Sequence, residues 1–161
     1  MSEFQSSPQV AAFVERLGRL DAGDRARFKR SAGKTMGEAT NTLGLFYSLL
    51  PRGIPPLREQ TYFLVATLYP LAESGGTGDL GAALRQCRRK SNAQGLDRRV
   101  EVLLDADETQ LPFRLRQAVS YLHSSRTRVN WAQLLEDLLL WNHPKRFIQQ
   151  KWARSYFVQP E

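Results

Sequence analysis

The chain has 161 residues, of which 42% are hydrophobic and 10% aromatic, so its composition is that of a globular protein and excludes a disordered one. Lysine and arginine number 23 against 16 acidic residues, which gives a net charge of +7 and a pI near 10.0. A single cysteine, Cys87, excludes an internal disulfide bond and a cysteine-based zinc site. This length predicts one compact domain, or two small ones that share a core.

The first ten residues, MSEFQSSPQV, lack a basic segment followed by an apolar stretch, and no apolar run approaches the ~18 residues that a membrane span needs. We therefore expect a soluble, cytoplasmic protein with no membrane partner. The basic pI favours nucleic acid as its partner. The alternative is that the excess charge only keeps the protein in solution.

The N-terminal residues predict two helices. Ser7 before a proline is typical of a helix start, and apolar residues at helical spacing continue to Gly18. Asp21 is the expected cap of a second helix, which stops at Gly33. Because the cations of this second helix repel one another, we expect a partner such as phosphate to offset the repulsion. The cations include Lys29, Arg30 and Lys34.

Two further helices are expected before the middle of the chain. An apolar stripe predicts one helix over 35–50, although Gly37 and Gly44 weaken it by roughly 1 kcal/mol each relative to alanine. A nearly continuous apolar run predicts a buried helix over 57–69, which ends at Pro70.

The small residues of 73–78, ESGGTG, predict a linker. We expect it to separate an N-terminal helical lobe, 1–74, from a C-terminal helical bundle, 79–161. No segment alternates apolar and polar residues convincingly, so no strand is expected. The sequence therefore predicts an all-α fold, a helical bundle of about eight or nine helices in two packed lobes.

The bundle is expected to begin with a helix capped by Asp79, with Cys87 as a small core residue on its inner face. After a break at 91–95, a second helix turns its leucines and valine inward. The outer faces of the two helices carry arginines, among them Arg85, Arg88, Arg98 and Arg99.

The closing stretch, 111–157, reads as three helices. Their expected starts are Thr109, Asn130, and Asn142 with Pro144. The middle helix is almost wholly apolar, and the flanking ones pair an apolar stripe with cations. We expect its large side chains to form the structural hub, namely Trp131, Leu134, Leu135, Leu138 and Trp141.

Motifs for enzymatic chemistry are weak. The residues of 76–81 match G-x-G-x-x-G, but that fingerprint needs a preceding strand, and a helix is expected there instead. His123 and His143 have no further metal ligand at helical spacing. Glu136 and Asp137 diverge by about 100° on a helix and make a poor catalytic pair. We predict no enzyme, no cofactor and no small-molecule ligand.

The cations gather in clusters opposite apolar stripes, and once the helices pack these clusters can converge into a groove. Arginines that track a backbone bind a single strand without regard to its sequence. Tyr121, Tyr156 and Phe157 can stack on bases, although aromatic residues at helical spacing are more often core. The clusters lie at 25–34, 85–90, 98–99, 114–116 with 126–128, and 145–154.

Five motifs stand out in the second half of the chain: DLGAALR at 79–85, DRRVEVLL at 97–104, LPFRLRQAVSYL at 111–122, VNWAQLLEDLLLW at 129–141 and KRFIQQKWARSYF at 145–157. Together these motifs resemble the CasB family, the small subunit of the type I-E CRISPR surveillance complex, Cascade. The agreement is looser in the N-terminal half, and Asn130 stands where the family pattern leads us to expect aspartate.

The resemblance implies an all-helical, non-catalytic subunit, with two copies packed head to tail against the backbone and large subunits of Cascade. Such a subunit contacts the CRISPR RNA and target DNA, and it holds the displaced non-target strand in a basic groove, which stabilises the R-loop in antiviral defence.

By motif position, the resemblance implies a set of nucleic-acid contacts, of which only Arg58 lies outside the clusters seen from composition. The clusters themselves add Lys34, Arg85 and Arg88. The contacts that the resemblance implies are Lys29, Arg30, Arg58, Arg98, Arg99, Arg116, Lys145 and Arg146.

Two other functions remain open at this point. A helix-turn-helix regulator would use the helices that begin near 111 and 130, but the second offers leucines and acids where base-reading side chains are needed. A structural adaptor would use its arginines to bind acidic proteins, without direct contact to nucleic acid. A third function, that of a nuclease, would need acids or histidines clustered for a metal ion, and the sequence shows no such cluster.

Overall fold

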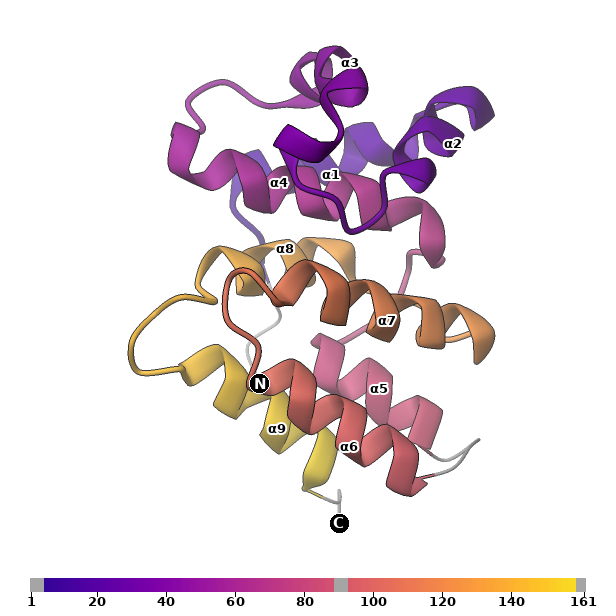
Figure 1. Cartoon of the computed structure of the whole chain (residues 1–161), viewed down its shortest axis with the longest axis vertical. Coiled ribbons are helices and arrows are strands. Elements are labelled where there is room, and N and C mark those ends of the chain that lie inside the picture. Colours follow the sequence, from indigo (N-terminus) through magenta and orange to yellow (C-terminus); the bar gives the residue numbers. More distant parts are fainter. Residues whose placement is uncertain (1–4, 89–92, 159–161) are drawn as a thin grey trace.

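The structure, a computed structural model, describes residues 5–88 and 93–158. Within those ranges the chain forms nine α-helices and three short 3-10 turns, which confirms the predicted all-α class. The helices stack in tiers along the long axis (Figure 1). The upper tier holds α1 (Pro8–Gly18), α2 (Ala22–Arg30), α3 (Leu43–Leu49) and α4 (Pro56–Leu68). The middle tier holds α7 (Leu111–Ser124) and α8 (Trp131–Leu139). The lower tier holds α5 (Leu80–Arg88), α6 (Ala93–Leu104) and α9 (Phe147–Phe157).

The first two helices begin at the predicted caps. The Ser7 hydroxyl accepts a hydrogen bond from the Val10 amide at 3.3 Å, and the Asp21 carboxylate accepts one from the Asp24 amide at 2.8 Å. Each bond satisfies one of the amides that a helix start leaves without a backbone partner. These starts were predictable because a cap is a local interaction.

The single helix predicted over 35–50 is wrong. The segment forms two 3-10 turns, Met36–Glu38 and Thr40–Thr42, and the short helix α3. The Thr35 amide bonds the Glu38 side chain at 2.9 Å, which starts a new turn. Ala39 then leaves helical geometry, with φ −136° and ψ 49°. The apolar stripe therefore belongs to several short turns, in which Ala39 and Phe46 are buried and Tyr47 is exposed.

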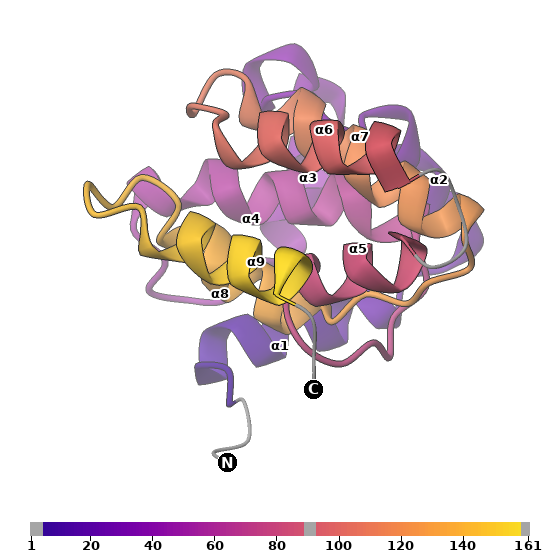
Figure 2. The ribbon, with the colours of Figure 1, turned by 90° about the horizontal axis from the view of Figure 1, so that it is seen from below.

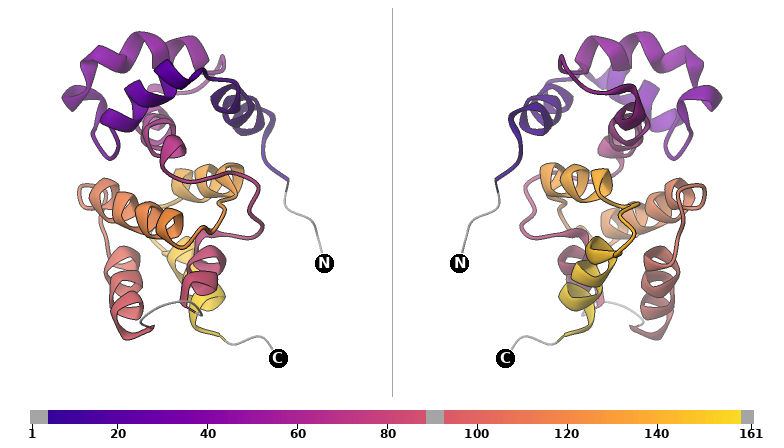
Figure 3. Two further views of the ribbon diagram at one scale, coloured as in Figure 1. Left: turned by 90° about the vertical axis from the view of Figure 1, so that its right-hand side faces the viewer. Right: turned by 90° about the vertical axis from the view of Figure 1, so that its left-hand side faces the viewer.

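The run from Tyr62 to Leu68 is buried on every face of α4, as predicted, but the predicted burial is wrong for the first turn, where Leu57 is 96% exposed. This is possible because α4 packs on α2 on one side and on α7 and α8 of the middle tier on the other, while Phe13 of α1 and Phe46 of α3 contact its aromatic rings. The same stacking is visible from both sides of the molecule (Figure 3). One hydrophobic cluster therefore runs through both halves of the chain.

The middle helix α8 is the predicted hub, and its large apolar side chains and Trp141 are buried. Asn130 caps it by accepting from the Gln133 amide at 3.1 Å. The start of α7 differs from the prediction. Asp107, not Thr109, supplies the acceptor, and it receives the amides of Thr109 and Gln110 at 2.9 Å each.

The lower tier depends on a close approach between α5 and α9, which lie side by side (Figure 2). A Cβ atom at Gly81 would lie 2.3 Å from the Trp152 carbonyl oxygen, so only glycine fits. The last helix begins at Phe147 and not at Asn142 or Pro144, because Arg146 is left-handed, with φ 54°.

The linker predicted at 73–78 is fixed to the segment before α8. The Val129 amide donates to the Glu73 carbonyl at 2.8 Å, and the Gly76 amide donates to the Val129 carbonyl at 3.3 Å. A Cβ at Gly76 would collide with the Arg128 carbonyl at 2.4 Å. Glycine is needed here for backbone packing, which explains the G-x-G-x-x-G match without a nucleotide. The division into lobes 1–74 and 79–161 stays a prediction.

In the described part of the chain, no helix is both long enough and apolar enough to cross a membrane.

The Gly81 contact predicts a stability effect. Gly81→Ala should lower the free energy of unfolding by about 1–3 kcal/mol, because its methyl group forces α5 away from the backbone of α9. Urea denaturation measures the change. Gly44→Ala in α3 is the control, since no atom lies within 4 Å of its Cβ position. It should leave stability unchanged or raise it by up to about 1 kcal/mol. Equal losses in both variants would contradict the account.

Candidate nucleic-acid interface

The structure divides the predicted cations into two groups. Some form bonds inside the molecule, and the rest project from its surface. Lys29, Arg30, Lys34, Arg58, Arg98, Arg99, Arg116 and Lys145 are all exposed, whereas Arg85, Arg88 and Arg146 are half-buried.

Arg85 and Arg88 belong to a network that joins α5, α6 and α9. Arg88 donates from Nε and Nη2 to the two carboxylate oxygens of Asp97, at 2.9 and 3.3 Å. Tyr156 donates its hydroxyl to the same carboxylate at 2.5 Å, and Arg85 donates to the Tyr156 carbonyl at 2.5 Å. These guanidinium groups hold three helices together, which limits what they can offer to a ligand.

Charge and hydrogen bonding in this network shift the pKa values of its members. The hydrogen bond from Arg88, followed by that from Tyr156, lowers the pKa of Asp97 below its ordinary value. Burial, together with the bond to Asp97, raises the pKa of the Tyr156 hydroxyl. The network is therefore an ionised carboxylate held between a cation and a neutral phenol at neutral pH.

Arg146 also bonds internally. Its guanidinium donates to the carbonyls of Leu104 at 3.0 Å, Trp141 at 3.3 Å and Ala106 at 3.4 Å, and it lies 5.6 Å from the centroid of the Trp141 ring. It thereby joins the end of α6 to the start of α9. Its neighbour Lys145 is exposed and makes no such bond within the described chain.

Most of the predicted cations that are exposed form no bond within the described part of the chain. Across residues 5–88 and 93–158, none of the following forms an ion pair or a side-chain hydrogen bond: Lys29, Arg30, Lys34, Arg58, Arg98, Arg116 and Lys145. Such a set of like charges in solvent is what a phosphate backbone binds.

The turn after α2 brings two of these clusters together. A Cβ at Gly33 would lie 3.2 Å from Cδ of Arg116 and 3.4 Å from the Pro112 carbonyl, and Gly33 has a φ of +78° that favours glycine. The aliphatic stem of Arg116 on α7 therefore passes close to Gly33. Lys34, the next residue along the chain, is exposed.

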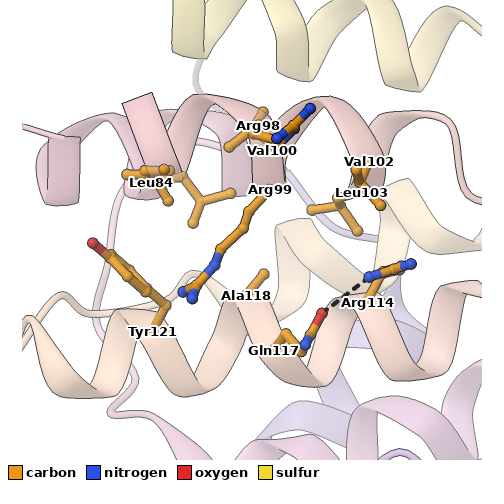
Figure 4. A pocket seen from close by; sticks show the side chains of 12 residues that line it. Leu84, Arg98, Arg99, Val100, Val102, Leu103, Arg114, Gln117, Ala118 and Tyr121 are labelled. Atoms are coloured by element: carbon orange, nitrogen blue, oxygen red, sulfur yellow. Dashed lines mark hydrogen bonds between the residues drawn. The ribbon is translucent and has the colours of Figure 1, made fainter. Parts of the chain in front are cut away.

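The other flank of α7 faces α6 across an open cleft of about 300 Å³. We call this the α6–α7 cleft. The guanidinium of Arg99 lies over the Tyr121 ring, 5.4 Å from its centroid, and Arg114 donates to the Gln117 amide oxygen at 3.4 Å (Figure 4). The cleft is lined by Arg99, Val100 and Leu103 of α6 and by Arg114, Ala118 and Tyr121 of α7.

The exposed ridge of α7 thus has cations on both flanks, Arg116 toward α2 and Arg114 toward α6. We call this surface the α2–α7–α6 face; it carries Lys34, Arg116, Arg114, Arg98 and Arg99. The predicted site omitted Arg114, although its spacing with Gln117 and Tyr121 placed all three on one helix face. The α6–α7 cleft beside that helix face depends on residues of α6 that are distant in the sequence, so residue spacing within α7 could not predict it.

Arg58 and Lys145 are not brought to this face. Arg58 lies in the first turn of α4, and Lys145 lies in the turn before α9. Those segments are on the left of Figure 1, and α2 is on the right. Of the aromatic residues considered for stacking, Tyr156 is buried in the core, Phe157 is exposed, and Tyr121 lies in the cleft.

Among the described residues, no group of three or more His, Cys, Asp or Glu side chains is arranged to hold a metal ion. The two motifs weighed for enzymatic chemistry, the glycine pattern and the Glu136–Asp137 pair, both have structural roles. Asp137 is 2% exposed and accepts hydrogen bonds from Trp152 Nε1 at 2.7 Å and Lys151 Nζ at 2.6 Å.

The family model of CRISPR-associated protein Cse2 matches residues 24–157 of the chain. A Cse2 protein of Thermus thermophilus is 33% identical over 136 residues, which cover 83% of this chain and 78% of the relative.

Solved structures agree with this match. A crystal structure of a Cse2-family protein from Thermus thermophilus has a TM-score of 0.81 at 31% identity and covers 96% of this chain and 100% of its own. CasB of M. ruber has a TM-score of 0.76 at 32% identity and covers 95% and 94%. A chain of a CRISPR RNA-guided surveillance complex shares the fold, with a TM-score of 0.79 at 20% identity over 92% and 91%.

The Asp97 network predicts a pH dependence of stability. The pKa of Asp97 is lowered in the folded protein. Its contribution to the free energy of unfolding is therefore complete above the ordinary carboxyl pKa of 3.8 and is lost as the pH falls through the folded value. The stability difference between wild type and Asp97→Asn should therefore be constant near neutral pH and shrink in acid. Urea denaturation across pH measures it. Asp105→Asn, an exposed control outside the network, should show a smaller difference.

The neighbours Lys145 and Arg146 should differ when changed. Arg146→Gln should lower the free energy of unfolding by about 1–3 kcal/mol, because it leaves the Leu104 carbonyl without its side-chain donor. Lys145→Gln should leave stability unchanged, since its side chain is exposed. Thermal denaturation by circular dichroism compares them, and equal stability of the two variants would contradict the internal role of Arg146.

Proposed function

Because the chain belongs to the Cse2 family of CRISPR-associated proteins, we propose that it is a non-catalytic subunit of a Cascade surveillance complex that holds a single strand of nucleic acid on its cationic surface. Its expected partners are the other Cascade subunits, a second copy of itself, the CRISPR RNA and the target DNA. The occupant we propose for the cationic surface is the displaced non-target strand.

The observation that carries the proposal is the α2–α7–α6 face. Cations on two flanks of one helix, supplied by α6, α7 and the turn after α2, suit a backbone that carries a phosphate at every step. Lys34, Arg98 and Arg116 are exposed and form no ion pair within the described residues, so no internal bond has to break when they meet phosphate. The energetic cost of binding is correspondingly small.

Modest contacts of this kind are sufficient for the proposed task. In an RNA-guided complex the guide–target duplex replaces a DNA duplex of similar stability, so the exchange is nearly balanced. A few phosphate contacts to the displaced strand then favour the open state. The guide RNA reads the sequence, and this subunit needs no base specificity.

Chains of the same fold support the assembly part of the proposal. Similar chains occur in structures described as a CRISPR RNA-guided surveillance complex and as E. coli Cascade bound to a PAM-containing double-stranded DNA target. At 20% identity each, they speak for the fold of this chain. The sites Lys29, Arg30, Arg58 and Lys145 remain proposed contacts, to nucleic acid or to neighbouring subunits.

A helix-turn-helix regulator fits the structure poorly. Its recognition helix would be α8, but Trp131, Leu135 and Asp137 of that helix are buried between the tiers. A buried helix cannot enter a major groove. The adaptor hypothesis keeps the same cations and differs only in its partner, so a binding measurement decides it.

Single-stranded DNA affinity against salt is the test. The slope of log affinity against log salt should be about −0.7 for each phosphate neutralised, and two unrelated sequences should bind alike. Arg98→Gln with Arg116→Gln should reduce the slope by about 1.4. Fluorescence anisotropy measures both quantities.

The matched control removes two arginines elsewhere. Arg19 is paired with Glu15 at the end of α1, and Arg52 lies in the turn before α4. Arg19→Gln with Arg52→Gln should leave the slope nearly unchanged. A slope near zero in the wild type would reject the nucleic-acid role and leave the adaptor, whereas strong sequence preference would favour a regulator.

A further inference from the structure

The α6–α7 cleft has an apolar floor, which phosphate binding alone does not require. This floor is formed by Val100 and Leu103, which are each 2% exposed, and by Ala118, which lies partly buried opposite them. A volume of about 300 Å³ is at the lower end of the range of ligand pockets, so it suits a small, flat group.

The ends of the cleft are cationic. Arg99 reaches from α6 toward α7 at one end, where the Tyr121 ring supports its guanidinium by a cation–π contact at 5.4 Å. Arg114 lies at the other end with Gln117, and Ala118 lies between them (Figure 4). Neither arginine forms an ion pair with any acid in the described ranges of the chain.

An apolar surface between two guanidinium groups matches one nucleotide within a strand. A nucleobase is flat and stacks on apolar, aromatic or guanidinium surfaces, and a phosphate follows it on each side. We propose that the α6–α7 cleft binds one nucleotide of a single strand, with its base over Ala118 and its flanking phosphates at Arg99 and Arg114. This rests on the proposed function, which brings a strand to the same face.

The assignment gives Tyr121 a positioning role. Its ring holds Arg99 across the cleft, so the guanidinium is already placed when a strand arrives. Gln117 does the same for Arg114 at the other end. Preorganised cations of this kind lose little side-chain entropy on binding.

The decisive variant is Ala118→Leu, which fills the floor of the cleft and leaves every cation in place. Its control is Ser120→Leu, which adds the same side chain at an exposed position of α7 outside the cleft. Circular dichroism should show both variants folded, because each new side chain extends into open space.

Two probes of equal length separate base from phosphate. One is oligodeoxythymidine, and the other is an abasic strand that keeps only sugar and phosphate. The wild type should bind oligodeoxythymidine at least about five-fold more tightly than the abasic strand, the lower bound for one stacked base. In Ala118→Leu the ratio of the two affinities should fall to about one while the salt slope stays unchanged. In Ser120→Leu both the ratio and the slope should stay unchanged.

The outcomes distinguish the two proposals. Equal affinity of the wild type for both probes, with a normal salt slope, would overturn the nucleotide cleft and leave the cationic face intact. Absence of salt-dependent binding would overturn the proposed function, and the cleft with it. A ratio that survives Ala118→Leu would place the base contact elsewhere.

The same measurement with oligouridine identifies the strand. If Ala118→Leu weakens oligodeoxythymidine more than oligouridine, the occupant is DNA, and the reverse result assigns RNA. Either result supports a nucleotide in the cleft. No change with either strand in Ala118→Leu would overturn it.

Discussion

The buried carboxylate of Asp137 determines how the lower half of the molecule is assembled. An unpaired charge in a protein interior costs several kcal/mol, so the carboxylate fixes the position of whatever bonds it. Two of its donors, the Trp152 indole and the Lys151 ammonium, lie next to each other on α9, and a third, the Gln133 side-chain amide, lies on α8 itself. Only one register of α9 on α8 satisfies them. In that register the Trp152 carbonyl faces α5, and Gly81 lets α5 approach it.

Helix α9 also fixes the position of α6, which bears part of the cationic surface. One turn after Trp152, Tyr156 bonds Asp97 of α6, and Asp97 is immediately followed by Arg98 and Arg99. The position of α6, and therefore the width of the α6–α7 cleft, is set by its direct packing on α7 together with the Asp97 contact to α9 on its opposite face. Under the proposed function, the internal arginine Arg88 would contribute to binding indirectly, because it holds the helix that presents the exposed arginines. Two neighbouring arginine clusters thus differ in role, because Arg85 and Arg88 join helices inside the molecule, whereas Arg98 and Arg99 are exposed.

Local interactions account for what the sequence could predict. The Ser7, Asp21 and Asn130 caps involve atoms three residues apart, and the buried faces follow from helical spacing. What it could not predict depends on distant partners. Arg146 finds a carbonyl 42 residues away, and nothing in its neighbourhood distinguishes it from exposed Lys145. The break near Ala39 was missed because a buried stripe looks alike on one long helix and on several short turns.

A cationic face and an apolar cleft make contributions of different physical kinds. Phosphate contacts weaken steeply with salt, whereas stacking against an apolar floor depends little on it. Neither contribution depends on the base sequence, because every nucleotide has the same phosphate and every base has a π face. A surface that combines them therefore retains a strand at physiological salt and stays indifferent to its sequence, as a guide-directed complex requires. A base held between Arg99 and Arg114 is also unavailable for pairing. The cleft would then oppose reannealing directly, which phosphate contacts alone do not do.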